Sequence, residues 1–149
     1  MRQQGANANY TGNVLEQIVI TRLRSSGYTE IKNENYLKLE KYYIPQYKIC
    51  NGIYGTPLKT DVLIFDEIKY PAKLAIEMKW QQTSGSVDEK YPYLVLNIKQ
   101  MFPCPAIIVI DGGGYKDGAV EWLKNQVDDK LIGVFDMAAF VKWANKGGL

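Results

Sequence analysis

Polar and apolar side chains alternate along the segment LAIEMKWQ, residues 74–81. A period of two predicts a β-strand with one apolar face. The residues of its second face are Ala75, Glu77, Lys79 and Gln81. The preceding segment DVLIF, residues 61–65, is apolar at both parities, which predicts a strand covered on both sides. We expect the two strands to form a hairpin, in which the polar row is either a solvated face or a functional site.

The rest of the chain alternates between helical and extended patterns. Asn13 is a good N-cap, and the apolar stripe that follows predicts a helix over Val14–Ser26. The polar residues 1–12 before it are expected to form a mobile arm. Further strands are predicted over 42–50, 104–110 and 131–135, and further helices over 91–101, 119–127 and 136–145. This order predicts an α/β fold in a single domain, residues 1–149, with a mixed central sheet flanked by helices.

Composition and charge restrict the possible classes of protein only slightly. A hydrophobic share of 46% and a charged share of 23% are ordinary for a globular domain. No apolar run approaches the roughly 18 residues of a membrane span, and no signal-peptide core is visible, so we expect a cytoplasmic protein with no membrane partner. The excess of basic residues in 1–60 over acidic ones is compatible with nucleic acid binding, and equally with an ordinary mixed surface.

The chain contains no histidine, and this absence restricts its chemistry. It excludes Ser-His-Asp and Cys-His catalysis and any His-ligated zinc. The two cysteines, Cys50 and Cys104, stand apart in apolar contexts and are expected to be small core residues. Acid–base or metal chemistry must therefore come from Asp, Glu, Lys or Tyr.

The predicted hairpin brings charged side chains together across its two strands. With a turn centred near Tyr70, Asp61 lies across from Glu77 and Lys79, and residues two apart on one strand are about 6.5 Å apart on the same face. Two carboxylates in such a place form a hard-oxygen site suited to Mg²⁺. Lys79 is suited to position or deprotonate a water, or to neutralise charge developing on a phosphate.

These residues resemble a known family. Asp61 followed by Glu77-Met78-Lys79 resembles the motif of the PD-(D/E)XK nuclease superfamily, whose fold is restriction-endonuclease-like. An upstream helix with a carboxylate, GNVLE, and the helix and strand after the motif match its αβββαβ core. The run YGTPLKTDVLIF…IEMKWQQTSGSVDEKYPY is similar to small bacterial or phage restriction-type endonucleases, and the resemblance covers about residues 12 to 145. Thr60 stands where the motif has proline.

The resemblance implies a role for each matching residue. The expected metal ligands are Asp61, Glu77, the backbone carbonyl of Met78 and, directly or through water, Glu16. Lys79 would be the catalytic lysine, and Gln81 follows on the same face. Glu16 is equally placed to close a capping box with Asn13. The implied cofactor is Mg²⁺, with Mn²⁺ as a possible substitute.

The function implied by the resemblance is a Mg²⁺-dependent DNA endonuclease, encoded by a bacterium or phage. Its expected role is restriction-like, phage-borne or homing, and its expected assembly is a homodimer or a higher homo-oligomer. The alternatives are a Holliday-junction resolvase or repair nuclease of the same fold, and a non-catalytic DNA-binding module.

Other segments supply candidate contacts to DNA. Lysines interleaved with aromatic residues, Lys38, Lys41 and Lys48, and the later Lys90 are expected nucleic-acid-binding residues, although a core edge explains the same pattern. The glycine-rich loop DGGGYKDG lacks both the P-loop and the dinucleotide-binding patterns. No nucleotide cofactor is therefore expected. The loop is interpreted as a strand–helix turn or as a contact to the DNA backbone.

Overall fold

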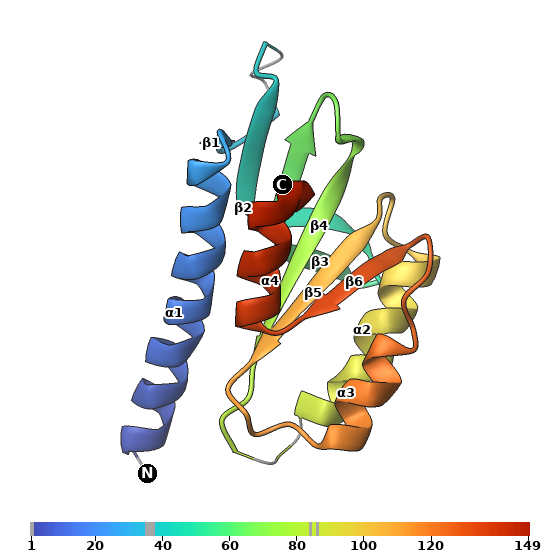
Figure 1. The fold of residues 1–149 in the computed structure, drawn as a ribbon. Coiled ribbons are helices and arrows are strands. Elements are labelled where there is room, and N and C mark those ends of the chain that lie inside the picture. Colours follow the sequence, from blue (N-terminus) through green and yellow to red (C-terminus); the bar gives the residue numbers. More distant parts are fainter. Residues whose placement is uncertain (1, 35–37, 84, 86) are drawn as a thin grey trace.

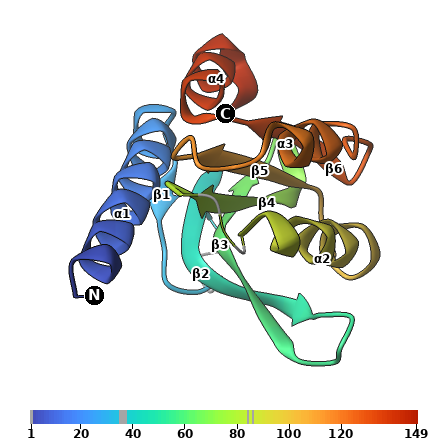
Figure 2. The same cartoon turned by 90° about the horizontal axis from the view of Figure 1, so that it is seen from below.

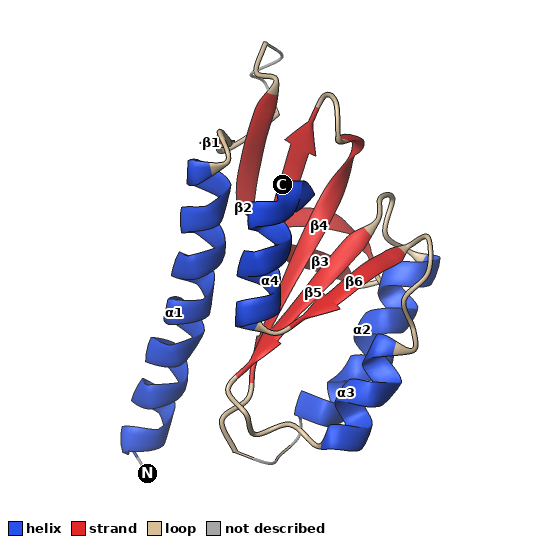
Figure 3. Cartoon of the chain, viewed as in Figure 1, coloured by secondary structure: helices blue, strands red, loops and turns tan. Residues whose placement is uncertain are grey.

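A computed structural model describes residues 2–34, 38–83, 85 and 87–149, which form a mixed sheet flanked by helices (Figures 1 and 3). The strands are β1 (Thr29–Glu30), β2 (Lys41–Asn51), β3 (Pro57–Asp66), β4 (Tyr70–Trp80), β5 (Ala106–Asp111) and β6 (Leu131–Phe135). The helices are α1 (Arg2–Ser25), α2 (Val87–Gln100), α3 (Asp117–Lys124) and α4 (Met137–Trp143), with a π-helical turn at Ala144–Gly148. Within the described ranges, no helix is long and apolar enough to cross a membrane.

The strands lie in the sheet in the order of the sequence, β1 to β6. The central strands β2, β3 and β4 are antiparallel neighbours, whereas β4, β5 and β6 run parallel. Parallel neighbours need a crossover, and α2 and α3 supply these connections. The predicted α/β class and mixed sheet are confirmed.

Helices cover both faces of the sheet (Figure 2). One core cluster joins α1 and α4 to the sheet, and the other joins α2 and α3 to the opposite face. The central strand β3 contributes to both, because Val62 and Ile64 belong to the first cluster and Leu63 to the second. The segment DVLIF is therefore apolar at both parities because its strand is covered on both faces, as predicted.

Two predicted helix starts are wrong. Helix α1 begins at Arg2 rather than at Val14, so Asn13 lies inside the helix and does not cap it. Residues 2–12 contain no proline, and their unfavourable glycines cost only about 1 kcal/mol each, which does not end a helix. Helix α2 begins at Val87, four residues before the predicted start. The expected mobility of residues 1–12 stays a prediction.

The turn between β3 and β4 is tighter than predicted. Asp66 pairs with Tyr70, so the turn centres on Ile68. The Asp66 carboxylate holds it by accepting hydrogen bonds from the backbone N–H groups of Ile68 at 2.9 Å and Lys69 at 3.2 Å. The register places Val62 opposite Ile76 and thereby sets Asp61 beside Glu77. The predicted neighbourhood of these carboxylates is confirmed.

Candidate active site

Strands β3 and β4 separate at the position of the predicted site. Their backbone pairing runs as far as Val62 and Ile76, whereas β3 continues beside β2 down to Pro57. Figure 2 shows β2 and β3 extending together away from β4. Past the last pair, Met78 donates its backbone N–H to Asp61 Oδ2 at 2.7 Å. A carboxylate thus takes the place of the missing ladder bond and is fixed in the opening between the strands.

Glu77 and Lys79 lie on the face of β4 that is covered by α2. Strand parity puts them on the same side as Ala75, which belongs to the core cluster of α2. The Lys79 Nζ atom lies 3.6 Å from Glu77 Oε2. Glu77 is only 4% exposed, and the Lys79 side chain is about one third exposed. A buried carboxylate therefore stands beside a cation that is accessible to solvent.

Burial raises the pKa of Glu77 to about 7. The Lys79 ammonium opposes this shift, the charge of Asp61 adds to it, and a hydrogen bond with Thr60 lowers the pKa slightly. The charge of Lys79 therefore offsets only part of the cost of ionising Glu77 beside Asp61. A divalent cation between them would supply the missing charge.

The donor set fits such an ion. Mg²⁺ is commonly held by one or two carboxylates and keeps its other positions for water and substrate phosphates. Asp61 and Glu77 offer two carboxylates on neighbouring strands. Within the described ranges, no three Asp, Glu or Cys side chains are close enough to form a larger cluster.

Glu16 is not brought into this pair. It lies on α1, whose apolar side packs on the opposite face of the sheet from α2. Its capping role is wrong because Asn13 is helical, and its role as a metal ligand stays a prediction. The same holds for the backbone carbonyl of Met78.

A groove of about 490 Å³ runs between the two strands and α2. Its charged lining residues are Glu77, Lys59, Lys79 and Lys90. Lys90 was expected to contact nucleic acid, and the structure places it in this groove. Lys59 was missed, although it precedes Asp61 by two residues and strand parity puts both on one face. Three lysines with one buried carboxylate suit a polyanionic ligand.

Gln81 lies at the end of the same row but outside the residues that line the groove. It is buried, its Nε2 donates to the Gly114 carbonyl at 3.3 Å, and its Oε1 has no hydrogen-bond partner among the described residues. The glycine-rich loop packs on it so closely that a Cβ at Gly112 would lie 2.3 Å from the Gln81 carbonyl oxygen. The loop is a strand–helix turn that closes the end of β4, and the catalytic role of Gln81 stays a prediction.

The other predicted DNA-contacting lysines lie outside the groove. Lys41 is engaged within the fold, since its Nζ lies 3.6 Å from Asp66 Oδ2 and donates to the Ser26 carbonyl. It joins the end of α1 to the β3–β4 turn. Lys38 and Lys48 are exposed, and Lys48 lies directly opposite Lys59 on the neighbouring strand.

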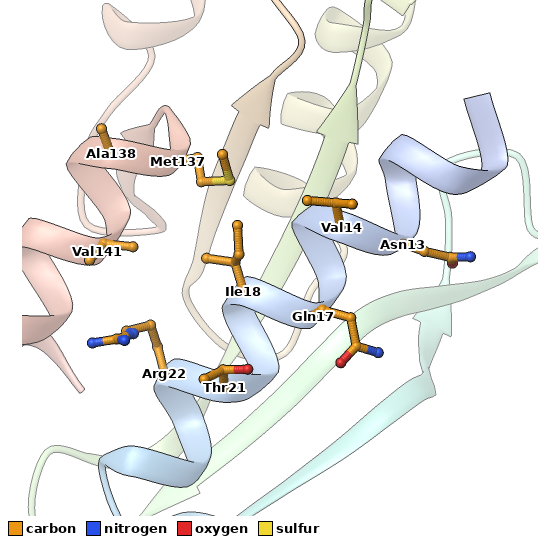
Figure 4. A pocket seen from close by; sticks show the side chains of 9 residues that line it. All are labelled: Asn13, Val14, Gln17, Ile18, Thr21, Arg22, Met137, Ala138 and Val141. Atoms are coloured by element: carbon orange, nitrogen blue, oxygen red, sulfur yellow. The ribbon is translucent and has the colours of Figure 1, made fainter. Parts of the chain in front are cut away.

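A hollow larger than this groove lies elsewhere. It measures about 870 Å³ and lies between α1 and α4, on the opposite side of the sheet (Figure 4). The described residues that line it are Asn13, Val14, Gln17, Ile18, Thr21, Arg22, Met137, Ala138 and Val141. None of these described residues carries a carboxylate, the side chain that proteins most often use to bind Mg²⁺.

Comparison with known proteins identifies the class. A sequence model described as a PD-(D/E)XK nuclease superfamily domain matches residues 7–148, and the chain belongs to this superfamily. The observed order of α1, then β2 to β4, then α2 and β5 is consistent with a restriction-endonuclease-like core. No curated protein and no solved structure matches the chain at a significant level.

Proposed function

We propose that this protein is a metal-dependent DNA endonuclease that hydrolyses phosphodiester bonds. The observation that carries the proposal is the proximity of the Asp61 and Glu77 carboxylates, beside Lys79, where two strands separate next to a cationic groove. Membership of the nuclease superfamily gives the same reaction class.

Each residue of the site has a distinct chemical task. Asp61 and Glu77 would hold a divalent ion such as Mg²⁺ or Mn²⁺, which when bound polarises a phosphoryl oxygen and acidifies water. Lys79 orients the attacking water and offsets negative charge that develops on the phosphate. The water releases a proton to solvent as its oxygen forms a bond to phosphorus, the bond to the leaving sugar oxygen breaks, and that oxygen takes up a proton from solvent. Lys59 and Lys90 attract the DNA backbone into the groove.

Plasmid cleavage tests this proposal. Purified protein is incubated with supercoiled plasmid, with phage genomic DNA and with four-way junctions, each in Mg²⁺, in Mn²⁺ and in EDTA, beside the variants Glu77→Gln and Lys79→Met. A double variant, Glu121→Gln with Lys124→Met, is the matched control because it removes one carboxylate and one lysine from exposed positions on α3.

Cutting that needs the metal, fails in both site variants and persists in the control supports the proposal. Plasmid and branched DNA that all stay intact, while the parent still binds DNA, contradict it and favour the non-catalytic DNA-binding module. Discrete fragments from a genomic substrate would assign the restriction-like role, and selective cutting of four-way junctions would assign a resolvase.

A homodimer is the assembly we propose with this function. Among its described residues one chain offers one candidate site of this kind, so cutting both strands in a single binding event would use two copies. Sedimentation of the DNA complex measures the stoichiometry. A single chain that nicks one strand contradicts the dimer and leaves the chemistry in place.

A further inference from the structure

An exposed aromatic side chain stands at the tip of the β2–β3 hairpin. Tyr54 is 77% exposed. Its ring stacks on Tyr93 of α2, with the ring centroids 5.4 Å apart and an angle of 20° between the planes. The exposure of Tyr54 leaves much of its ring open to a further planar group.

The loop that carries Tyr54 is held in place. The buried amide of Asn97 on α2 accepts a hydrogen bond from the Ile53 N–H at 2.9 Å. The loop closes on itself as Gly52 donates to the Thr56 carbonyl at 2.8 Å. A Cβ at Gly52 would lie 2.8 Å from Leu58 Cδ1 and 2.9 Å from Asn97 Oδ1, so any larger residue would displace the side chains that hold the loop. Because the loop is anchored, the Tyr54 ring loses little further conformational freedom on binding a ligand.

The aromatic pair is continuous with the groove of the proposed active site. Tyr93 and Asn97 line the same groove as Glu77 and Lys79. The stacked rings therefore stand at its margin, on the wall formed by α2 and the β2–β3 hairpin. A ligand that reaches the carboxylates along this wall passes the rings.

Three lysines, Lys48, Lys59 and Lys90, lie along or beside this wall, and none of them has a charged partner among the described residues. Lys48 and Lys59 are directly opposite each other on β2 and β3, an arrangement in which like charges destabilise the sheet. Lys90 precedes Tyr93 by three residues on α2, so both lie on one side of that helix. In the part of the chain that the structure describes, none of these lysines forms an ion pair. An external polyanion would relieve their repulsion.

We infer that Tyr54 and Tyr93, with Lys59 and Lys90, form a binding platform for an unpaired nucleotide of DNA. An unpaired base stacks on the open face of Tyr54, and its flanking phosphates contact the two lysines. Bases inside a continuous duplex are stacked on their neighbours and cannot reach the ring. The inference rests on the proposed nuclease function and names its substrate class: DNA with unpaired nucleotides beside the phosphate that is cut.

A binding experiment in EDTA tests the platform without cleavage. Fluorescence anisotropy measures the affinity of a labelled 12-nucleotide single strand and of its duplex for the parent, Tyr54→Phe and Tyr54→Leu. Trp122→Leu is the matched control, because Trp122 is an exposed aromatic on α3. Tyr54→Leu is expected to weaken single-strand binding about tenfold, which is within the range for loss of one base stack. The single-strand affinities of Tyr54→Phe and Trp122→Leu are expected to stay within about twofold of that of the parent. The duplex affinity of each variant is expected to stay within about twofold of the parent's duplex affinity.

Two further readouts keep the platform falsifiable. A 2-aminopurine base in the single strand is expected to lose fluorescence on binding the parent and Tyr54→Phe, and to keep it with Tyr54→Leu. The double variant Lys59→Ala with Lys90→Ala is expected to lower the slope of log single-strand affinity against log salt by about 1.4. Equal single-strand affinity of Tyr54→Leu and the parent overturns the base stack, and an unchanged salt slope overturns the phosphate contacts.

A parallel cleavage assay in Mg²⁺ separates the two proposals. If the parent cuts DNA and Tyr54 has no influence on single-strand binding, the platform is overturned and the nuclease stands. If the parent binds single strands through Tyr54 and cuts no DNA, the platform is supported and the nuclease proposal fails.

Discussion

The two faces of the β3–β4 hairpin are formed by the same two strands but carry different kinds of side chain. Toward α1 and α4, the hairpin presents Val62, Ile64 and Ile76, all fully buried in an apolar cluster. Toward α2, the same strands present Asp61 and Glu77 beside the cationic groove. Burial stabilises the first face and raises the energy of the second, since a buried carboxylate with one cationic neighbour is poorly compensated. The face that is costly for stability is the one suited to bind an ion.

The hollows on the two sides of the sheet repeat this contrast. The hollow between α1 and α4 is the larger, and its described lining contains no carboxylate. The groove beside α2 is smaller and contains a buried glutamate and three lysines. We therefore chose the candidate site by the mismatch between burial and charge and not by the volume of the hollow.

Asp61→Asn is expected to have the largest effect, a loss of at least about a thousandfold in the rate of metal-dependent cleavage. The substitution removes one of two candidate ligand charges, while the amide oxygen can still accept the hydrogen bond from Met78. Cleavage of plasmid under single-turnover conditions measures the rate. A variant that cuts within tenfold of the parent would show that Asp61 only holds the two strands together.

Glu77→Gln is expected to stabilise the metal-free protein at pH 8 by about 2 to 3 kcal/mol. Folding raises the pKa of Glu77 from 4.5 to about 7. Between these two pH values the folded state holds a proton on Glu77 that the unfolded state has released. The free energy of unfolding of the parent therefore falls as the pH rises through this window, and the glutamine variant escapes that loss.

Urea unfolding in EDTA at pH 4, 6 and 8 measures this effect. The advantage of Glu77→Gln should grow with pH and shrink again when Mg²⁺ is added, because the ion stabilises the parent. An advantage that is equal at all three pH values would mean that Glu77 is not the group that titrates.

Gly112→Ala is expected to cost at least about 2 kcal/mol of stability, and Gly113→Ala about 1 kcal/mol. Both glycines have positive φ, but only a Cβ at Gly112 meets backbone, at Gln81. Comparing the two variants therefore separates the cost of the positive φ from the cost of the steric clash between the loop and the Gln81 backbone. Thermal melts of both variants give the difference, and equal melting temperatures would contradict the close packing of the loop on β4.

Substitutions in the hollow between α1 and α4 are expected to have the smallest effect. Gln17→Ala with Thr21→Ala changes two exposed lining residues of α1 and should leave the cleavage rate within about twofold of the parent. The plasmid assay that tests the site also tests this control. A large loss of cleavage would place part of the catalytic apparatus on this side of the sheet. It would also support the predicted role of Glu16, on the same helix, as a metal ligand.

Local pattern was sufficient to predict much of the site and of the sheet. The alternation around Glu77 and Lys79 predicted a strand, and the apolar DVLIF beside it predicted coverage on both faces. Both follow from the period of two in an extended chain, which depends on neighbouring residues only. Helix starts were less predictable, because the ends of α1 and α2 depend on weak local energies of less than about 1 kcal/mol per residue.

The sequence by itself determined the row of Asp61, Glu77 and Lys79, the lack of histidine chemistry and the membership of a nuclease superfamily. Only the tertiary structure decided that β3 leaves β4 at Asp61, that Lys59 and Lys90 face one groove, and that Tyr54 stacks on Tyr93. It also placed Glu16 on a helix that covers the opposite face. The physical reason is range: strand parity is a property of adjacent residues, whereas these contacts join segments whose approach is set by the packing of the whole sheet against its helices.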